Sequence, residues 1–206
     1  DPDKINGQMV IVTKKLNYSK LDIDRLESPL YIIAKENCFG KLFRWRDNVK
    51  ILNLGSLNVD ITYLVDHVVA PGETIKASRR ERFCGGKGLN QSIALAKAGA
   101  QVYHAGCIGR DGEMLSAMLR NAGVDIRFLE QVDEPSGHAI IQVDEKGQNS
   151  IVIYGGANTC VTTEYIDQVI ANFDCGDVLL LQNEISNIDY AIQAAARQGM
   201  RVALNP

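Results

Sequence analysis

The sequence predicts an α/β fold in which a doubly wound sheet of parallel strands is flanked by helices. Apolar runs typical of buried strands alternate with helix-like segments from residue 49 onward, and several of those helix-like segments end at a glycine. The chain of 206 residues is 46% hydrophobic and 23% charged, which is the composition of a globular protein with a buried core. Its length fits one domain or slightly more.

The expected elements follow one another in a regular order. Apolar runs predict strands at residues 49–57, 101–109, 124–132, 177–185 and 200–206. Helices are predicted at residues 90–100, 112–123, 162–173 and 187–199, the third of them capped by Thr162 or Thr163. Two alternating runs on either side of the turn EKGQ (145–148) predict a β-hairpin over residues 138–156.

The N-terminal part of the chain differs in charge from the rest. Residues 1–50 contain 10 Lys or Arg and 7 Asp or Glu, whereas residues 51–206 contain 12 and 18, which gives the whole chain a net charge of −3. We therefore treat residues 1–48 as an N-terminal extension of unknown role. A strand at 9–13, a short helix at 21–28 and a hairpin formed by 31–34 and 41–45 are expected within it.

Two interpretations of this extension stay open. It is either a structural addition packed on the main domain or a nucleic-acid-binding module that uses Lys41, Arg44, Trp45 and Arg46. An excess of three positive charges is small, and a mixed, solvated face is the usual cause of such a run. Nucleic acid is therefore not the expected partner.

Cysteine and histidine spacing gives no sign of a metal site. The five cysteines contain no CxxC pair and the three histidines are scattered, so neither a disulfide framework nor bound zinc is expected. No apolar run reaches the about 18 residues that a membrane span needs. The first residues also lack the pattern of a signal peptide, so we expect no membrane partner and a cytoplasmic location.

Polar clusters follow several predicted strands, and chemistry is expected at the carboxyl ends of parallel strands. In GSLNVD (55–60), Asn58 and Asp60 are two residues apart, so in an extended segment both point to one face. An amide beside a carboxylate can bind neighbouring hydroxyl groups of a sugar, although an Asx turn or a helix cap is an equal alternative. A further carboxylate, Glu184, follows the apolar run at 177–181.

A glycine-rich segment, FCGGKGLNQS (83–92), precedes a predicted helix. Its three glycines let the backbone approach a ligand closely, and a helix N-terminus favours anions and polar acceptors. The segment is not a Walker loop, because Lys87 is followed by Gly88 rather than by Ser or Thr, and its glycine spacing is not that of a dinucleotide-binding loop. A plain glycine-rich turn remains the alternative.

Taken together, these motifs resemble ribokinase and the wider carbohydrate kinase family. The resemblance covers about residues 49–206 but not residues 1–48. It rests on six motifs that occur at the spacing found in the family: GSLNVD (55–60), PGET (71–74), GGKGLNQS (85–92), GRDG (109–112), QNE (182–184) and VALNP (202–206). It implies a ribokinase-like doubly wound sheet with a small β-sheet lid formed by residues 61–85 and 137–154. In this family the lid also pairs with a second subunit, so a homodimer is implied.

The resemblance also implies a sugar site. Asn58 and Asp60 match residues that bind sugar hydroxyls, and the substrate-binding residues implied in addition are Gly86, Lys87, Asn90, Glu184, Ala139 and Ile141. Ala139 and Ile141 would lie on the lid face toward the sugar. A lid that closes over the sugar excludes water, which would otherwise accept the phosphoryl group.

The implied activity is ATP-dependent phosphorylation of D-ribose, or a related pentose, at the 5-hydroxyl. The family uses ATP, Mg²⁺ and a monovalent cation such as K⁺, together with a catalytic aspartate and a glycine-rich anion hole. The segments that match these parts are not found in the sequence, which reaches only VALNP. We therefore expect the C-terminal part of the fold to be absent, and the chain to hold the sugar site but to be inactive alone. The alternative is a non-catalytic sugar-binding regulatory protein with a basic N-terminal interaction segment.

Overall fold

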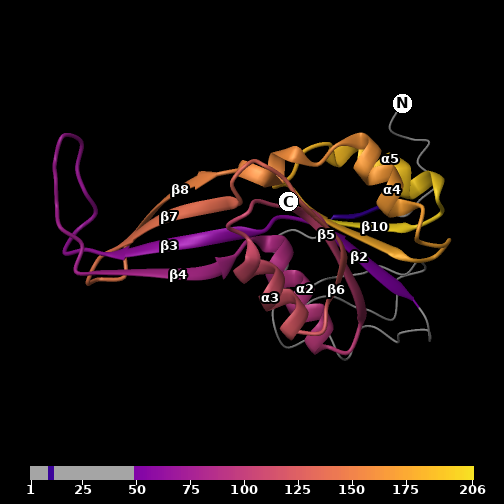
Figure 1. The fold of residues 1–206 in the computed structure, drawn as a ribbon, viewed down its shortest axis with the longest axis horizontal. Coiled ribbons are helices and arrows are strands. Elements are labelled where there is room, and N and C mark those ends of the chain that lie inside the picture. The colour runs from indigo at the N-terminus through magenta and orange to yellow at the C-terminus, as the bar shows by residue number, and fades with distance from the viewer. Residues whose placement is uncertain (1–8, 12–48) are drawn as a thin grey trace, which may run out of the picture.

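The computed structural model describes residues 9–11 and 49–206, and the main sheet in this part has six parallel strands (Figure 1). Their order across the sheet is β1-β10-β9-β2-β5-β6. The strands are β1 (Met9–Ile11), β2 (Lys50–Leu54), β5 (Gln101–Ile108), β6 (Asp125–Gln131), β9 (Val178–Gln182) and β10 (Arg201–Asn205). The predicted α/β class is confirmed. The expected helix at 21–28 and hairpin at 31–45 lie outside the described residues.

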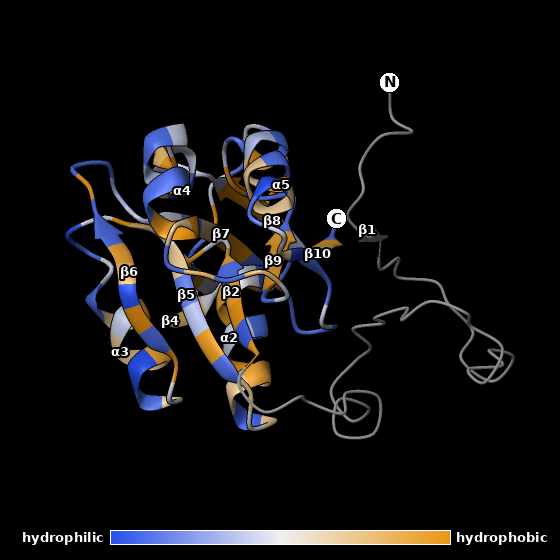
Figure 2. Cartoon of the chain, turned by 90° about the vertical axis from the view of Figure 1, so that its right-hand side faces the viewer, coloured by the Kyte–Doolittle hydropathy of each residue, from blue (hydrophilic) through white to orange (hydrophobic). Residues whose placement is uncertain are grey.

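Helices cover both faces of this sheet (Figure 2). Helices α2 (Lys87–Lys97) and α3 (Glu113–Asn121) pack on one face, and α4 (Thr163–Ile170) and α5 (Ile188–Arg197) pack on the other. Strand alternation sends Leu52 and Leu54 into the α4–α5 core and Ile51 into the α2–α3 core. Both faces are apolar, as expected for a parallel sheet buried on both sides.

A second, four-stranded sheet projects from the body (Figure 1). Its order is β4-β3-β7-β8, formed by β3 (Asn58–Leu64), β4 (Arg79–Gly85), β7 (Gly137–Val143) and β8 (Asn149–Tyr154). The β7–β8 hairpin that the alternation predicts is present. The main chain returns to the body through the 3₁₀ helix η4 (Gly156–Cys160).

One predicted helix start is wrong by three residues, whereas the other three helix starts are each within one residue of the prediction. The helix expected at 90–100 begins at Lys87 and ends at Lys97. Apolar periodicity starts only at Leu89, which hides the first turn, and that turn contains Gly88, a residue that disfavours helix interiors. The other helices lie within one to three residues of their predicted ends, and Thr162 caps α4 by accepting a hydrogen bond from the backbone N–H of Tyr165 at 3.1 Å.

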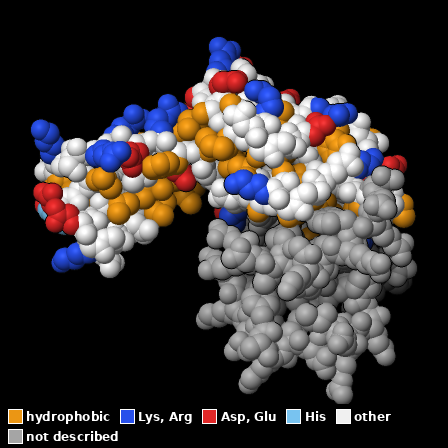
Figure 3. Space-filling view, turned by 90° about the horizontal axis from the view of Figure 1, so that it is seen from below, with side chains coloured by type: hydrophobic (Ala, Val, Ile, Leu, Met, Phe, Trp, Pro, Cys, Tyr) orange, Lys and Arg blue, Asp and Glu red, His pale blue; other side chains and the backbone are white. Residues whose placement is uncertain are grey.

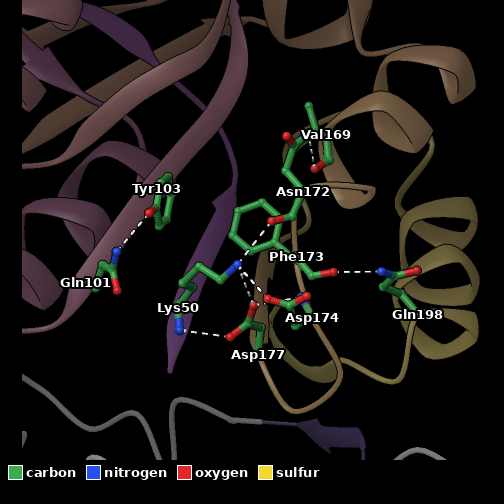
Figure 4. Close-up of polar contacts among 9 residues, drawn as sticks. All are labelled: Lys50, Gln101, Tyr103, Val169, Asn172, Phe173, Asp174, Asp177 and Gln198. Atoms are coloured by element: carbon green, nitrogen blue, oxygen red, sulfur yellow. Dashed lines mark hydrogen bonds and ion pairs between the residues drawn. The ribbon is translucent and has the colours of Figure 1, made fainter. Parts of the chain in front are cut away.

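The start of β2 is tied to the start of β9 by a buried carboxylate (Figure 4). Asp177 Oδ1 accepts from the Lys50 backbone N–H at 2.9 Å, and its Oδ2 accepts from the Asp174 backbone N–H at 2.8 Å. The Lys50 ammonium lies 2.9 Å from Asp174 Oδ2 and 3.5 Å from Asp177 Oδ2, and 5.5 Å from the centre of the Phe173 ring. Two backbone donors therefore depend on Asp177.

We expect Asp177→Ala to lower the free energy of unfolding by about 2 kcal/mol, because two charge-assisted hydrogen bonds are lost at a buried position. Urea denaturation of the chain measures this change. Asp174→Ala is the matched control, since that side chain is 82% exposed, and it should cost less than about 1 kcal/mol. Equal losses in the two variants would contradict a dominant role for Asp177.

Candidate functional site

The candidate site lies where β2 and β9 end and α2 begins. At this edge the loop 55–57 touches the first turn of α2 backbone to backbone. A Cβ atom at Gly88 would lie 2.5 Å from the Ser56 nitrogen, and one at Gly86 would lie 2.8 Å from the Ser56 carbonyl oxygen. Gly86 also has φ 99°, a conformation that favours glycine. The Leu89 N–H donates to the Ser56 carbonyl at 3.0 Å, which fixes the two segments together.

Glu184 joins this contact from the loop after β9. Its Oε2 accepts from the Ser56 hydroxyl at 2.6 Å, and its Oε1 lies 3.1 Å from the Lys87 ammonium. Burial alone would raise the pKa of Glu184, but hydrogen bonds from Ser56 and Lys87 and the positive charge of Lys87 outweigh burial and lower the pKa. Glu184 is therefore a fixed, ionised group at the positive end of a helix.

Asp60 is a second carboxylate at the same edge, and it is held differently. It lies over Gly85 on the neighbouring strand, where a Cβ atom would come within 2.1 Å of its Oδ2. Burial raises the pKa of Asp60, and the negative charge of Glu184 raises it further. No described residue donates a hydrogen bond to this carboxylate, which is partly exposed.

Asn58 is oriented by a residue that the sequence did not single out. The Asn158 side chain, from η4, donates to Asn58 Oδ1 at 2.8 Å and accepts from the Leu57 backbone N–H at 3.0 Å. Gly137 makes room for this pair, because a Cβ atom there would lie 2.1 Å from Asn158 Nδ2. With its oxygen occupied, Asn58 has its NH₂ group free of bonds to the described residues and able to donate to a ligand.

The small sheet extends the site through its register. Asn58 and Asp60 lie opposite Gly137 and Ala139 of β7, and Thr62 lies opposite Ile141. Directly opposed residues share a face, so Ala139 and Ile141 lie on the same face as Asp60. Asn90 is exposed in the first turn of α2, where its backbone N–H bonds to Gly86 and its side chain bonds to no other site residue.

A buried polar chain runs beneath the glycine contact. Asn53 of β2 donates to the Gly88 carbonyl at 2.7 Å and to the Ser92 hydroxyl at 2.8 Å, and it accepts from Gln182 at 2.9 Å. The Ser92 hydroxyl also lies 2.8 Å from His104 Nδ1, and burial lowers the pKa of His104 to about 4, so its ring is neutral. The sequence contains a signal for this buried polar chain, because Asn53 and His104 are polar residues inside otherwise apolar strands.

The described residues offer no metal-binding cluster and no membrane span. Within 9–11 and 49–206, three or more His, Cys, Asp or Glu side chains nowhere gather in a way that could hold a metal ion. Cys84, Cys107, Cys160 and Cys175 are free thiols. In the same residues the helices are too short or too polar to cross a bilayer. The residues of the alternative nucleic-acid-binding module, Lys41, Arg44, Trp45 and Arg46, lie outside the described part of the chain.

The chain belongs to the pfkB family of carbohydrate kinases, whose family model matches residues 48–206. Among its members the chain is similar to ribokinases. It is 37% identical over 158 residues to a ribokinase of Haemophilus influenzae, an alignment that covers 74% of this chain and 52% of the relative. It is also 34% identical over 164 residues to a ribokinase of Arabidopsis thaliana, covering 74% of this chain and 42% of that protein.

Solved structures agree with this assignment. A ribokinase of Cryptococcus neoformans in complex with ADP superposes with a TM-score of 0.66 at 36% identity, over 77% of this chain and 50% of that one. The Arabidopsis thaliana ribokinase complexed with ribose and ATP gives a TM-score of 0.65 at 32% identity, over 76% of this chain and 52% of that one. The resemblance drawn from the motifs is thus confirmed, and the chain spans about half the length of the curated relatives it matches.

We expect Gly88→Ala to lower the free energy of unfolding by about 1–3 kcal/mol, because the added methyl group meets backbone atoms that cannot move aside. Urea denaturation measures the loss. Ala94→Ser, an exposed change on the same helix, should stay within about 0.5 kcal/mol. If the two variants were equally stable, the close contact between loop 55–57 and α2 would not be structurally important.

We expect Asp60→Asn to be more stable than the wild type at pH 7. A raised pKa means that the folded state disfavours the ionised carboxylate, so wild-type stability falls as pH rises through the pKa of Asp60. The advantage of Asp60→Asn should therefore shrink at pH 4, near the ordinary pKa of about 3.9 for Asp. Urea midpoints at both pH values test this.

The exposed Asp66 provides the control for that comparison, because Asp66→Asn should leave both midpoints unchanged. A loss of stability in Asp60→Asn at pH 7 would show that donors hold the Asp60 carboxylate after all.

Proposed function

We propose that this chain forms the sugar-binding part of an ATP-dependent sugar kinase whose acceptor is D-ribose or a related pentose, phosphorylated at the 5-hydroxyl. The observation that carries the proposal is the Asp60 carboxylate, which faces the site without a donor and beside Glu184. Carboxylates accept strong hydrogen bonds from hydroxyl groups, and a partly buried acceptor that lacks a protein donor favours a ligand that supplies one.

The neighbouring groups suit a polyol. The Asn58 amide can donate to one ligand oxygen while Asp60 accepts from the next, since the two residues share a face. Lys87 and Asn90 add donors from α2. The Arabidopsis thaliana ribokinase that superposes on this chain was solved with ribose and ATP, which supports the same substrate class here.

We propose that the nucleotide and its ions bind outside the described residues. Relatives bound to ADP or ATP support a nucleotide cofactor, and Mg²⁺ and a monovalent cation such as K⁺ are proposed with it. Among the described residues, three or more His, Cys, Asp or Glu side chains nowhere gather in a way that could hold a metal ion. We propose no catalytic residue among the described residues, and we expect the chain to bind sugar without turning over ATP.

A second copy of the chain is the partner that we propose for the outer face of the small sheet. Ile140 and Val152 are opposed across β7 and β8, on the face away from Asp60, and are 42% and 67% exposed. Hydrophobic side chains gather on the surface of the small sheet (Figure 3). Because the kinase would draw on cellular ATP, we propose the cytoplasm as its compartment.

Calorimetric titration of D-ribose into the chain tests the sugar site. We expect Asp60→Ala and Asn90→Ala each to weaken binding about tenfold or more, because each removes a hydrogen-bonding group from the site. Asp66→Ala, an exposed change on the small sheet's loop, should not alter the affinity. Unchanged affinity in both site variants would rule out the proposed sugar site.

Ribose-dependent ATP turnover by the protein expressed from its complete gene tests the kinase assignment. Ribose binding without turnover in that protein would favour the sugar-binding regulatory alternative.

A further inference from the structure

Phe83 is a large apolar side chain on the same face of the small sheet as Asp60. It lies directly opposite Asp60 in the antiparallel ladder between β4 and β3, and 49% of it is exposed. Directly opposed residues of an antiparallel pair have Cβ atoms about 5 Å apart. A half-exposed benzyl ring therefore stands beside the carboxylate that lacks a donor.

Phe83 and Asp60 belong to a row of directly opposed residues that crosses the small sheet. Continuing across the sheet, Asp60 lies opposite Ala139, and Ala139 lies opposite Ile153. Ala139 is small and buried, whereas Ile153 is 66% exposed. In this row, the shorter side chains of Asp60 and Ala139 therefore lie between the larger apolar side chains of Phe83 and Ile153.

We infer that Phe83 is a specificity-determining residue that packs against a C–H face of the acceptor sugar while Asp60 accepts from its hydroxyls. This inference rests on the proposed function. A pentose ring carries hydroxyl groups on its edges and C–H groups on its faces. An aromatic face beside a hydrogen-bond acceptor matches both, because the ring buries apolar surface at low entropic cost.

The alternative role for an exposed ring is a contact between copies of the chain. Ile151 and Ile153 are exposed on the same face as Asp60, as Ile140 and Val152 are on the opposite face, so exposure alone does not separate the two roles. The position of Phe83 directly opposite Asp60 favours recognition, and the oligomeric state of the variants separates the two roles experimentally.

The test is calorimetric titration of D-ribose into the chain. We expect Phe83→Ala to weaken binding about tenfold, from the lost apolar contact, and Phe83→Tyr to restore wild-type affinity because it keeps the aromatic face. Met118→Ala, a change of a 45% exposed apolar side chain on α3, should leave the affinity unchanged. Circular dichroism of each variant checks the fold, and sedimentation equilibrium checks that Phe83→Ala keeps the oligomeric state of the wild type.

The outcomes separate the inference from the proposed function. If the wild type binds ribose and Phe83→Ala binds it equally well, Phe83 has no role in recognition and the sugar site stands without it. If Phe83→Ala loses affinity only together with its oligomeric state, the ring is a subunit contact and the inference is overturned. If the wild type does not bind ribose, the proposed function fails first.

Discussion

The close contact between the loop after β2 and the first turn of α2 is the constraint on which the site depends. Three glycines, Gly55, Gly86 and Gly88, remove the side chains that would separate the two segments. The contact turns the N–H groups of α2 toward Glu184, which approaches the Lys87 N–H at 3.4 Å and the Lys87 ammonium at 3.1 Å. A carboxylate supplied by another element thus compensates the positive end of a helix that has no acidic residue in its first turn.

Much of the fold was predictable because its signals are local. Strand and helix periodicity, the Thr162 cap and the glycine ends of helices depend on neighbours in sequence, and they identified the described elements after residue 49 except β3, β4 and η4. The start of α2 was missed because its first turn is set by packing of Gly88 on Ser56, a contact between residues 32 apart in sequence. A local pattern contains no information about that distance.

The site was only partly predictable for the same reason. The sequence singled out Asn58, Asp60 and Glu184 because each follows a predicted strand, whereas Lys87 was implied by the family resemblance. Asn158 and Ser56, which orient Asn58 and Glu184, were not singled out as such, since nothing in their own segments marks them as partners of residues 100 and 128 positions away. The row that places Phe83 beside Asp60 likewise follows only from the register of β3 and β4.

The strand order explains why one contiguous site forms from distant segments. Strands β2 and β9 are the central neighbours of the main sheet, with Leu54 opposite Leu181. From β2 the chain continues to β5 and β6 on one side of this pair, whereas β9 continues to β10 on the other. The pair is therefore the point where the chain order reverses, which is where open α/β sheets bind their ligands. Asp60 and Glu184 follow these two strands, so the two carboxylates of the candidate site have the same topological origin.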